Sequence, residues 1–183
     1  EYGYRDATIL KDSVWNVDPK HVDIYLKIDE GQKYYLRNII WVGNTVYPTL
    51  RLNAILGLKR GDVYNQKLLE KRVSKDDDAV ANLYYNNGYV FSSINPTEVN
   101  IDGDSIDLEM RVTEGPQAYL SHVRINGNTR LYENVVRREL RTKPGDLFSR
   151  EALMRSLREI QSMGHLDPEK RSQPDVKPNP EDG

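Results

Sequence analysis

The chain has 183 residues, which is enough for one large domain or two small ones. Hydrophobic residues make up 38% of it and charged residues 30%, and the formal net charge is -2. This charge excludes non-specific nucleic-acid binding, because neutralising phosphates requires an excess of Lys and Arg. The 12 tyrosines, together with the Val, Ile and Leu content, exclude a fully disordered chain.

Cysteine is absent, which excludes disulfides, thiolate zinc sites and cysteine nucleophiles. The three histidines, His21, His122 and His165, lie far apart and have no partner at a fixed spacing. The sequence therefore predicts no metal site, no cofactor and no enzymatic activity. No apolar run approaches the ~20 residues that a membrane helix needs. The chain opens at Glu1 within a strand-like pattern, so we expect it to be part of a longer protein.

The first predicted element is a β-hairpin within residues 1–32. Residues 7–15 are rich in strand formers and contain no proline, and residues 22–28 alternate apolar and polar side chains. A turn is expected near Asp18-Pro19. Because alternation is typical of a strand with one buried face, this hairpin should have one apolar side.

A strand and a helix follow the hairpin. Residues 35–42 are rich in Tyr, Ile, Trp and Val and end at the turn signal of residues 43–44, which predicts a strand. Residues 52–56 place apolar side chains at helical spacing. We expect Gly61-Asp62 to end that helix.

A longer helix and a second hairpin complete this pattern. Asn65 is a candidate N-cap, and Gly88 is placed to end the helix in a left-handed conformation. Residues 90–100 and 105–113 flank Asp102-Gly103, a dipeptide that favours a tight hairpin turn. The predicted order is β-α-α-β-β.

Three consecutive acids, residues 76–78, fall inside the longer predicted helix. Successive helical side chains point about 100° apart, so these carboxylates would not converge on one metal ion. We interpret them as a solvated helix face.

The sequence repeats itself at an offset of 84 residues. Residues 28–45 and 112–129 are identical at 7 of 18 positions, and the offset continues without a gap into residues 145–153. Gly3-Tyr4, Gly88-Tyr89 and Gly164-His165 mark the same point three times. The repeat is therefore a structural module.

We expect three modules with these boundaries. Residues 1–32 form the C-terminal hairpin of a truncated module, residues 33–115 form a complete one, and residues 116–183 form one that lacks its last strand. In the third, the second helix spans residues 150–163, has Ser149 as its candidate N-cap and is shorter than its counterpart. Its hairpin turn falls at Asp182-Gly183.

Tandem modules in this order resemble the POTRA domains of the Omp85 family. The resemblance rests on the turns at residues 43–44 and 127–128, the breaks at residues 61–62 and 145–146, and the Gly-Tyr pairs. It implies an α+β fold in which each module has a three-stranded mixed sheet covered by two helices. It also implies the end of a third POTRA domain, all of a fourth and most of a fifth.

The resemblance implies a periplasmic scaffold at the outer membrane of a Gram-negative bacterium. Its expected partners are unfolded outer-membrane proteins, outer-membrane lipoproteins of an assembly complex, and the protein's own C-terminal membrane barrel. Nucleic acid is not expected as a partner. One alternative is the POTRA region of a related transporter of the two-partner secretion or import type. Another is a KH-like nucleic-acid module, although residues 57–61 and 141–145 do not match its Gly-x-x-Gly loop.

Three sets of residues are candidate functional sites. The resemblance implies that an edge strand accepts clients, and the first module offers one without proline, whereas the later edges carry Pro96, Pro174 and Pro178. The client-binding residues are Ala7, Thr8, Ile9, Leu10, Lys11, Asp12, Ser13 and Val14. The resemblance also implies a partner contact at Arg137, Arg138 and Glu139. The alternative for Glu139 is a solvated helix position where it pairs with Lys143 at i,i+4.

The third set forms the joints between modules, which are Gly31, Gly115 and Pro116. Short links keep neighbouring modules in contact, and Pro116 should make the second joint the stiffer one. Each truncated module leaves unpaired sheet edges. We therefore also expect the N-terminal hairpin of one chain to pack on another chain.

Overall fold

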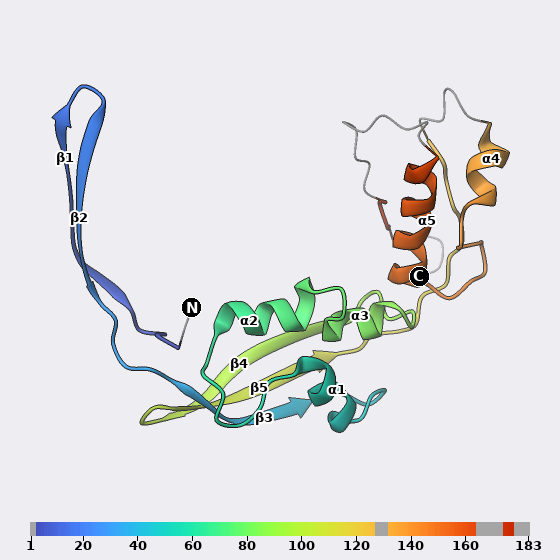
Figure 1. Ribbon diagram of the computed structural model, residues 1–183. Coiled ribbons are helices and arrows are strands. Elements are labelled where there is room, and N and C mark those ends of the chain that lie inside the picture. The colour runs from blue at the N-terminus through green and yellow to red at the C-terminus, as the bar shows by residue number, and fades with distance from the viewer. Residues whose placement is uncertain (1–2, 127–131, 164–173, 178–183) are drawn as a thin grey trace. The chain divides into compact units, whose positions relative to one another are not determined.

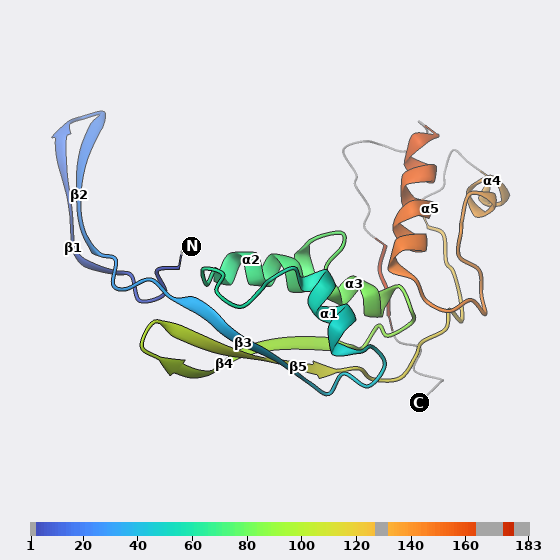
Figure 2. The same cartoon turned by 60° about the horizontal axis from the view of Figure 1, so that its bottom comes forward.

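A computed structural model describes residues 3–126, 132–163 and 174–177 (Figures 1 and 2). The chain divides into two compact units, Glu1–Ala79 with Ile94–Val112, and Val80–Ser93 with Thr113–Gly183. Each unit is described by itself. Four predicted features lie outside the described residues, namely the turn at 127–128, Gly164-His165, Pro178 and the turn at Asp182-Gly183.

The first unit begins with the predicted hairpin. Strands β1 (Thr8–Asp18) and β2 (His21–Asp29) pair in antiparallel fashion, as Figure 1 shows in blue. The turn lies at residues 19–20, where the Asp18 carboxylate accepts a hydrogen bond from the Lys20 amide at 2.8 Å. A second bond, to the His21 ring, closes the turn. These backbone and ring hydrogen bonds lower the pKa of Asp18.

One face of this hairpin is apolar, as the alternation predicts. Ile9 lies opposite Ile28, and Val14 lies opposite Ile24, so the four side chains share a face. All four are more than half exposed. A bulge between Ile9 and Lys11 interrupts the ladder. The hairpin therefore presents apolar surface to solvent.

A three-stranded mixed sheet follows. Strands β3 (Tyr35–Val42), β5 (Ser105–Thr113) and β4 (Ser93–Asp102) lie in the order β3-β5-β4. β3 and β5 are parallel, while β4 and β5 are joined by the tight turn at residues 103–104. The predicted α+β module with a mixed sheet is confirmed.

Helices α1 (Thr49–Leu56) and α2 (Gln66–Glu70) cover one face of this sheet (Figures 1 and 2). Every second residue of β5 from Ile106 to Val112 is buried, with exposed fractions of 0–5%. α1 adds Leu52 and Leu56, both fully buried. Burial of each such side chain is worth about 1.5–3 kcal/mol, so this layer supplies most of the cohesion of the unit.

Two predicted helix limits need correction. α1 ends at Gly57, which is left-handed at φ 71° and donates its N–H to the Asn53 carbonyl, rather than at Gly61. The predicted N-cap of the next helix is confirmed, since the Asn65 side chain accepts from the Leu68 amide. That helix, however, is not continuous to Gly88.

The longer helix breaks after a π-helical turn. α2 runs into η1 (Lys71–Lys75), Asp76 is extended at ψ 154°, and α3 (Val80–Tyr85) starts again after it. The prediction that residues 76–78 lie on a helix face is therefore wrong. Arg72 explains the break, because its guanidinium binds Asp76 and Asp78 and also donates to the carbonyls of Ile55 and Leu56. These contacts draw the acids toward the end of α1.

The second unit contains α3, α4 (Glu133–Arg138) and α5 (Arg150–Ser162). Ser149 caps α5 as predicted, accepting from the Ala152 amide at 3.3 Å. Ser156 of α5 is buried and accepts from the Arg141 amide at 2.7 Å. The Glu159 carboxylate accepts two further bonds from the Arg141 guanidinium. This pair lowers the pKa of Glu159 and fixes α5 to the loop after α4.

Among the described residues of the second unit, the segment that corresponds to β3 forms one bridge, Tyr119 with Leu147, and residues 120–126 are not assigned to a strand. β3 is held by its parallel ladder with β5, whereas no strand is described beside residues 117–126. A strand needs a paired neighbour to satisfy its backbone groups.

Among the described helices, none is long and apolar enough to cross a membrane.

Candidate functional site

The predicted client-binding edge lies on the exposed hairpin. Ala7 precedes β1, and the remaining predicted residues, 8–14, lie on it. Within the described part of the chain, β1 is paired with β2 alone, so its other edge carries backbone groups that no described strand satisfies. Ile9 and Leu10 are 62% and 58% exposed. An extended peptide would find both a backbone edge and apolar side chains here.

The other edge strands differ in proline content, as the sequence shows. Pro96 lies within β4, one of the two outer strands of the mixed sheet, and removes one amide donor there. Pro174 was predicted to lie in an edge strand, but residues 174–177 form no strand, and Pro174 instead lines a cavity of the second unit. β1 contains no proline, and neither do the edge strands β2 and β3, so among the described edge strands proline sets only β4 apart.

The predicted partner-binding residues lie at the end of α4. Arg137 forms an i,i+4 ion pair with Glu133, and Arg138 pairs with Glu139 at 3.1 Å. Glu139 is the C-cap of α4, and 32% of its side chain is exposed. The three residues form a surface cluster of mixed charge rather than a basic patch.

The predicted joint glycines have the same conformation. Gly31 and Gly115 are both left-handed at φ 67°, a value that side chains other than glycine rarely adopt. Asp6 lies 3.5 Å from a Cβ placed on Gly31, and Phe91 lies 3.2 Å from one placed on Gly115. The backbone conformation therefore favours glycine at both positions, and only at Gly115 would a side chain also be crowded.

One further glycine completes each joint, Gly3 in the first and Gly88 in the second, and neither was predicted as a joint residue. The Gly3 carbonyl accepts from the Tyr34 amide at 2.9 Å, and the Gly88 carbonyl accepts from the Ala118 amide at 2.8 Å. An added Cβ would lie 2.5 Å from Val63 at the first position and 2.5 Å from Leu147 at the second. The repeated Gly-Tyr pair was the signal for this contact.

The side chains that close the first joint are charged. Arg5 Nε lies 2.8 Å from a Glu98 carboxylate oxygen, and the Tyr64 hydroxyl donates to the other oxygen at 2.8 Å. The Tyr34 hydroxyl donates to Asp6 at 2.5 Å. Burial and the bond to Glu98 raise the pKa of Tyr64, so it remains a neutral donor. A polar cavity of about 400 Å³ borders this cluster, lined in part by Gly3, Arg5 and Tyr64.

Several of the described contacts of the second joint involve amide groups. Gln117 donates to the Asn87 carbonyl at 3.1 Å, and the Glu151 backbone amide donates to the Asn86 side chain at 2.8 Å. Arg150 donates to the Asn82 side chain at 3.2 Å and lies 5.8 Å above the Tyr85 ring. The two joints thus share a backbone scheme but differ in side-chain chemistry.

A buried ionic network lies on the face of the mixed sheet that the helices leave uncovered. Asp107 of β5 is 8% exposed and accepts two bonds from the Arg37 guanidinium, at 2.9 and 2.6 Å. Asn38 and Asn100 also donate to its carboxylate. The bonds from Arg37, followed by those from the two amides, hold the pKa of Asp107 far below its usual range. In the sequence, Asp107 is only one of the polar residues that alternate with apolar ones along residues 105–113.

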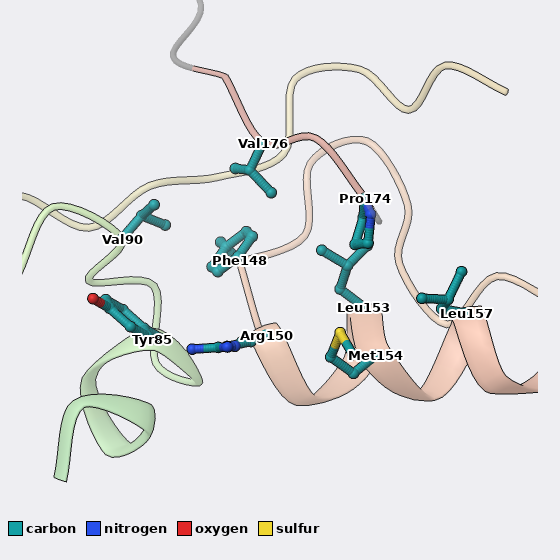
Figure 3. Close-up of a pocket in the computed structure, with 9 residues that line it drawn as sticks. All are labelled: Tyr85, Val90, Phe148, Arg150, Leu153, Met154, Leu157, Pro174 and Val176. Atoms are coloured by element: carbon teal, nitrogen blue, oxygen red, sulfur yellow. The ribbon is translucent and has the colours of Figure 1, made fainter. Parts of the chain in front are cut away.

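An apolar cavity of about 340 Å³ lies in the second unit (Figure 3). Leu153, Met154 and Leu157 line it from α5, and Phe148 lines it from the preceding turn. Val176 and Pro174 lie on the other side in Figure 3. The repeat pairs Leu153 with Leu69, which is 3% exposed in the first unit.

The described residues contain no group of three His, Cys, Asp or Glu side chains that could hold a metal ion.

Comparisons with known proteins agree with this arrangement. A family model described as POTRA, surface antigen variable number repeat, matches residues 34–115 and 118–183. The outer membrane protein assembly factor BamA of Nitratidesulfovibrio vulgaris is 28% identical over 156 residues, which cover 85% of this chain and 20% of that protein. BamA of Neisseria meningitidis serogroup B is 30% identical over 149 residues, which cover 77% of this chain and 19% of that protein.

The crystal structure of POTRA3-5 of Haemophilus influenzae BamA has a TM-score of 0.73 to this chain. It is 21% identical, and the match covers 91% of this chain and 65% of that one. At this identity, the likeness shows the fold. The chain spans about a fifth of the length of the curated relatives, since the matched shares are 20% and 19%.

Proposed function

The chain belongs to the POTRA family, and on that premise we propose that it is a periplasmic, non-enzymatic scaffold in the assembly of outer-membrane β-barrel proteins. Its place is the periplasmic side of the outer membrane of a Gram-negative bacterium. Its clients are unfolded outer-membrane proteins, and its further partners are assembly lipoproteins and the membrane barrel of its own protein. BamA-like relatives that are named as assembly factors support this proposal.

The proposal treats the chain as parts of three modules. Residues 1–32 are the hairpin of one, residues 33–115 are a complete module, and residues 116–183 are a module without its last strand. The repeat at offset 84 and the two separate matches to the family model support these boundaries.

The single observation that carries client binding is the outer edge of β1. Residues 8–14 combine an edge outside the β1-β2 pair with exposed apolar side chains and no proline. A strand added at such an edge gains main-chain hydrogen bonds whatever its sequence, which suits a scaffold with many clients. Transmembrane β-strands have an apolar residue at every second position, which matches the apolar face of the hairpin.

Proline substitution tests this edge. In a strand, neighbouring amides point to opposite edges, so of Asp12→Pro and Ser13→Pro one removes a donor from the outer edge and the other breaks the pairing with β2. Far-UV circular dichroism and thermal unfolding identify the variant whose hairpin is intact. That variant should lose photo-crosslinking to a peptide of about ten residues with a transmembrane-strand pattern.

The matched control is β4, where Pro96→Val restores a donor to the edge. Crosslinking of the peptide to β4 should rise in this variant. Unchanged crosslinking in both the intact β1 variant and Pro96→Val would show that clients do not bind by sheet extension.

We propose Arg137, Arg138 and Glu139 as a contact for a lipoprotein partner. The Arg138–Glu139 pair is on the surface, so a partner's charges can exchange with it. Glu139→Lys should weaken binding of the source organism's assembly lipoproteins by more than about 1 kcal/mol, or roughly fivefold in Kd. Glu151→Lys on α5 is a control of equal charge change, because that side chain is also exposed and paired with an arginine. Equal affinities for the two variants would exclude Glu139 from the contact.

A further inference from the structure

We propose that the first joint is an ion-pair hinge whose stiffness depends on salt, whereas the second joint is held by contacts that salt affects little. The proposal concerns the conformation of the chain and does not depend on the identity of its clients. It rests on the comparison of two joints that share one backbone scheme.

In each joint, a glycine carbonyl accepts a backbone hydrogen bond from the following segment, and the same glycine packs against an aliphatic side chain of that segment. In the first joint, Gly3 packs on Val63 and accepts from Tyr34. In the second joint, Gly88 packs on Leu147 and accepts from Ala118. Val63 and Leu147 are equivalent in the repeat, as the offset of 84 shows. Differences in stiffness must therefore come from the side chains around this scheme.

At the first joint, Arg5 bridges the two parts, beside the hydrogen bond from the Tyr34 hydroxyl to Asp6. It precedes the hairpin and binds Glu98 of β4 at 2.8 Å, while its guanidinium lies 5.9 Å above the Tyr34 ring. The Arg5 and Glu98 side chains are 36% and 25% exposed, so ions reach them. Burial opposes the charge of Arg5, but Glu98 and Asp6 outweigh it and raise the pKa of Arg5. Arg5 therefore stays charged, and the pair responds to ionic strength rather than to pH near neutrality.

At the second joint, hydrogen bonds to amide groups take the corresponding place. Asn86 and Asn87 accept from backbone and amide donors of the following segment. Arg150 binds a neutral amide of Asn82 and the face of Tyr85. The acceptors of these hydrogen bonds carry no net charge, so salt weakens the bonds only slightly.

The stiffness of the first joint can therefore change with salt while that of the second stays the same. The Debye length falls to roughly 3 Å at about 1 M salt, which is close to the length of the Arg5–Glu98 contact. An exposed pair of this kind loses most of its attraction there. The hairpin with its client edge would then move relative to the mixed sheet while the second joint keeps its contacts.

The absence of cysteine from the sequence makes the test direct, because two introduced cysteines are the only sites for spin labels. Asp23→Cys with Lys59→Cys spans the first joint inside the first unit, and Ser93→Cys with Arg158→Cys spans the second joint inside the second unit; all four positions are exposed. Distance distributions are measured by pulsed electron resonance at about 50 mM and about 1 M salt. For the first pair, the population outside the main distance should rise roughly two- to fivefold. For the second pair, it should not change.

Charge exchange separates an ion pair from general loosening. Arg5→Glu and Glu98→Arg should each broaden the first distribution at low salt, and the double exchange should narrow it again. Thermal unfolding confirms that each variant is folded. The proposal would be overturned if the distance distribution across the first joint changed neither with salt nor in Arg5→Glu. Equal broadening of the distribution across the second joint would also overturn it.

Discussion

Glycines at the joints show how one residue type sets the distance between segments. Gly3 and Gly88 have φ values of 94° and 86°, where other residues are strained. Each also faces an aliphatic side chain of the following segment closely enough that a methyl group would overlap it. Two separate physical reasons, backbone conformation and packing, therefore require glycine at these positions. Gly61 has a φ of 88° but no atom within 4 Å of an added Cβ, so only the first reason applies to it.

This contrast gives a prediction with an internal control. Gly61→Ala should reduce the free energy of unfolding by about 1 kcal/mol, because it strains the backbone alone. Gly88→Ala should cost about 2–3 kcal/mol, because Leu147 must also move away from the new methyl group. Urea denaturation of the two variants measures the difference. Equal costs would show that the Gly88–Leu147 contact is not tight.

At the scale of elements, the mixed sheet is stabilised differently on its two faces. The covered face is apolar, and the alternation of β5 predicts it. On the uncovered face, Arg37 of β3 donates two hydrogen bonds to the carboxylate of Asp107 on β5. A guanidinium that binds a carboxylate through two of its nitrogens is held in one geometry. This contact therefore also fixes the pairing of β3 with β5.

The ionic network predicts a dependence of stability on acid. The folded-state pKa of Asp107 lies below its unfolded value of about 3.9, so the network stabilises the fold above that pH. The contribution is lost as the pH falls below about 4 toward the lower folded-state pKa. The midpoint of thermal unfolding should therefore fall more steeply between about pH 4 and pH 2 in the natural chain than in Asp107→Asn. Parallel slopes in the two proteins would exclude this network as the cause.

Elements with a regular pattern could be predicted from the sequence, and elements that depend on distant contacts could not. The limits of β3 follow from local composition, as do the caps Asn65 and Ser149. The break between η1 and α3 depends on Arg72, whose partners include carbonyls 16 and 17 residues away. No periodicity in residues 66–88 reveals that contact. The Arg37–Asp107 network joins residues 70 apart and was missed for the same reason.

The candidate sites show the same limit. The edge strand could be predicted because proline and β-forming residues are local features of the sequence. The pairing of Glu139 with Arg138, its immediate neighbour, depends on how α4 ends, and the sequence had suggested Lys143 as the alternative partner. The glycine contacts of the joints were visible only as a repeated Gly-Tyr motif, whose meaning depends on what packs against it.

At the scale of the whole molecule, the repeat allows one part of the chain to explain another. The repeat pairs Ile24 and Ile28 of β2 with Leu108 and Val112 of β5. Leu108 and Val112 are 1% and 5% exposed, whereas Ile24 and Ile28 are 63% and 55% exposed. The same alternating pattern is thus buried in one hairpin and open in the other. Exposed apolar surface of this kind marks an interaction surface, and an isolated two-stranded hairpin is only marginally stable in water.

We therefore expect the hairpin to pack on a second chain through this face. Sedimentation analysis should show a mass that rises with protein concentration, because association buries the face formed by Ile9, Val14, Ile24 and Ile28. Ile24→Lys places a charge in that face and should shift the association to concentrations at least about tenfold higher, since burying an unpaired charge costs more than about 1.4 kcal/mol. Ser13→Lys is the matched control, because Ser13 pairs with Tyr25 on the opposite face and should leave association unchanged. A chain that stays monomeric at every concentration, or equal effects of the two substitutions, would show that this face does not mediate self-association.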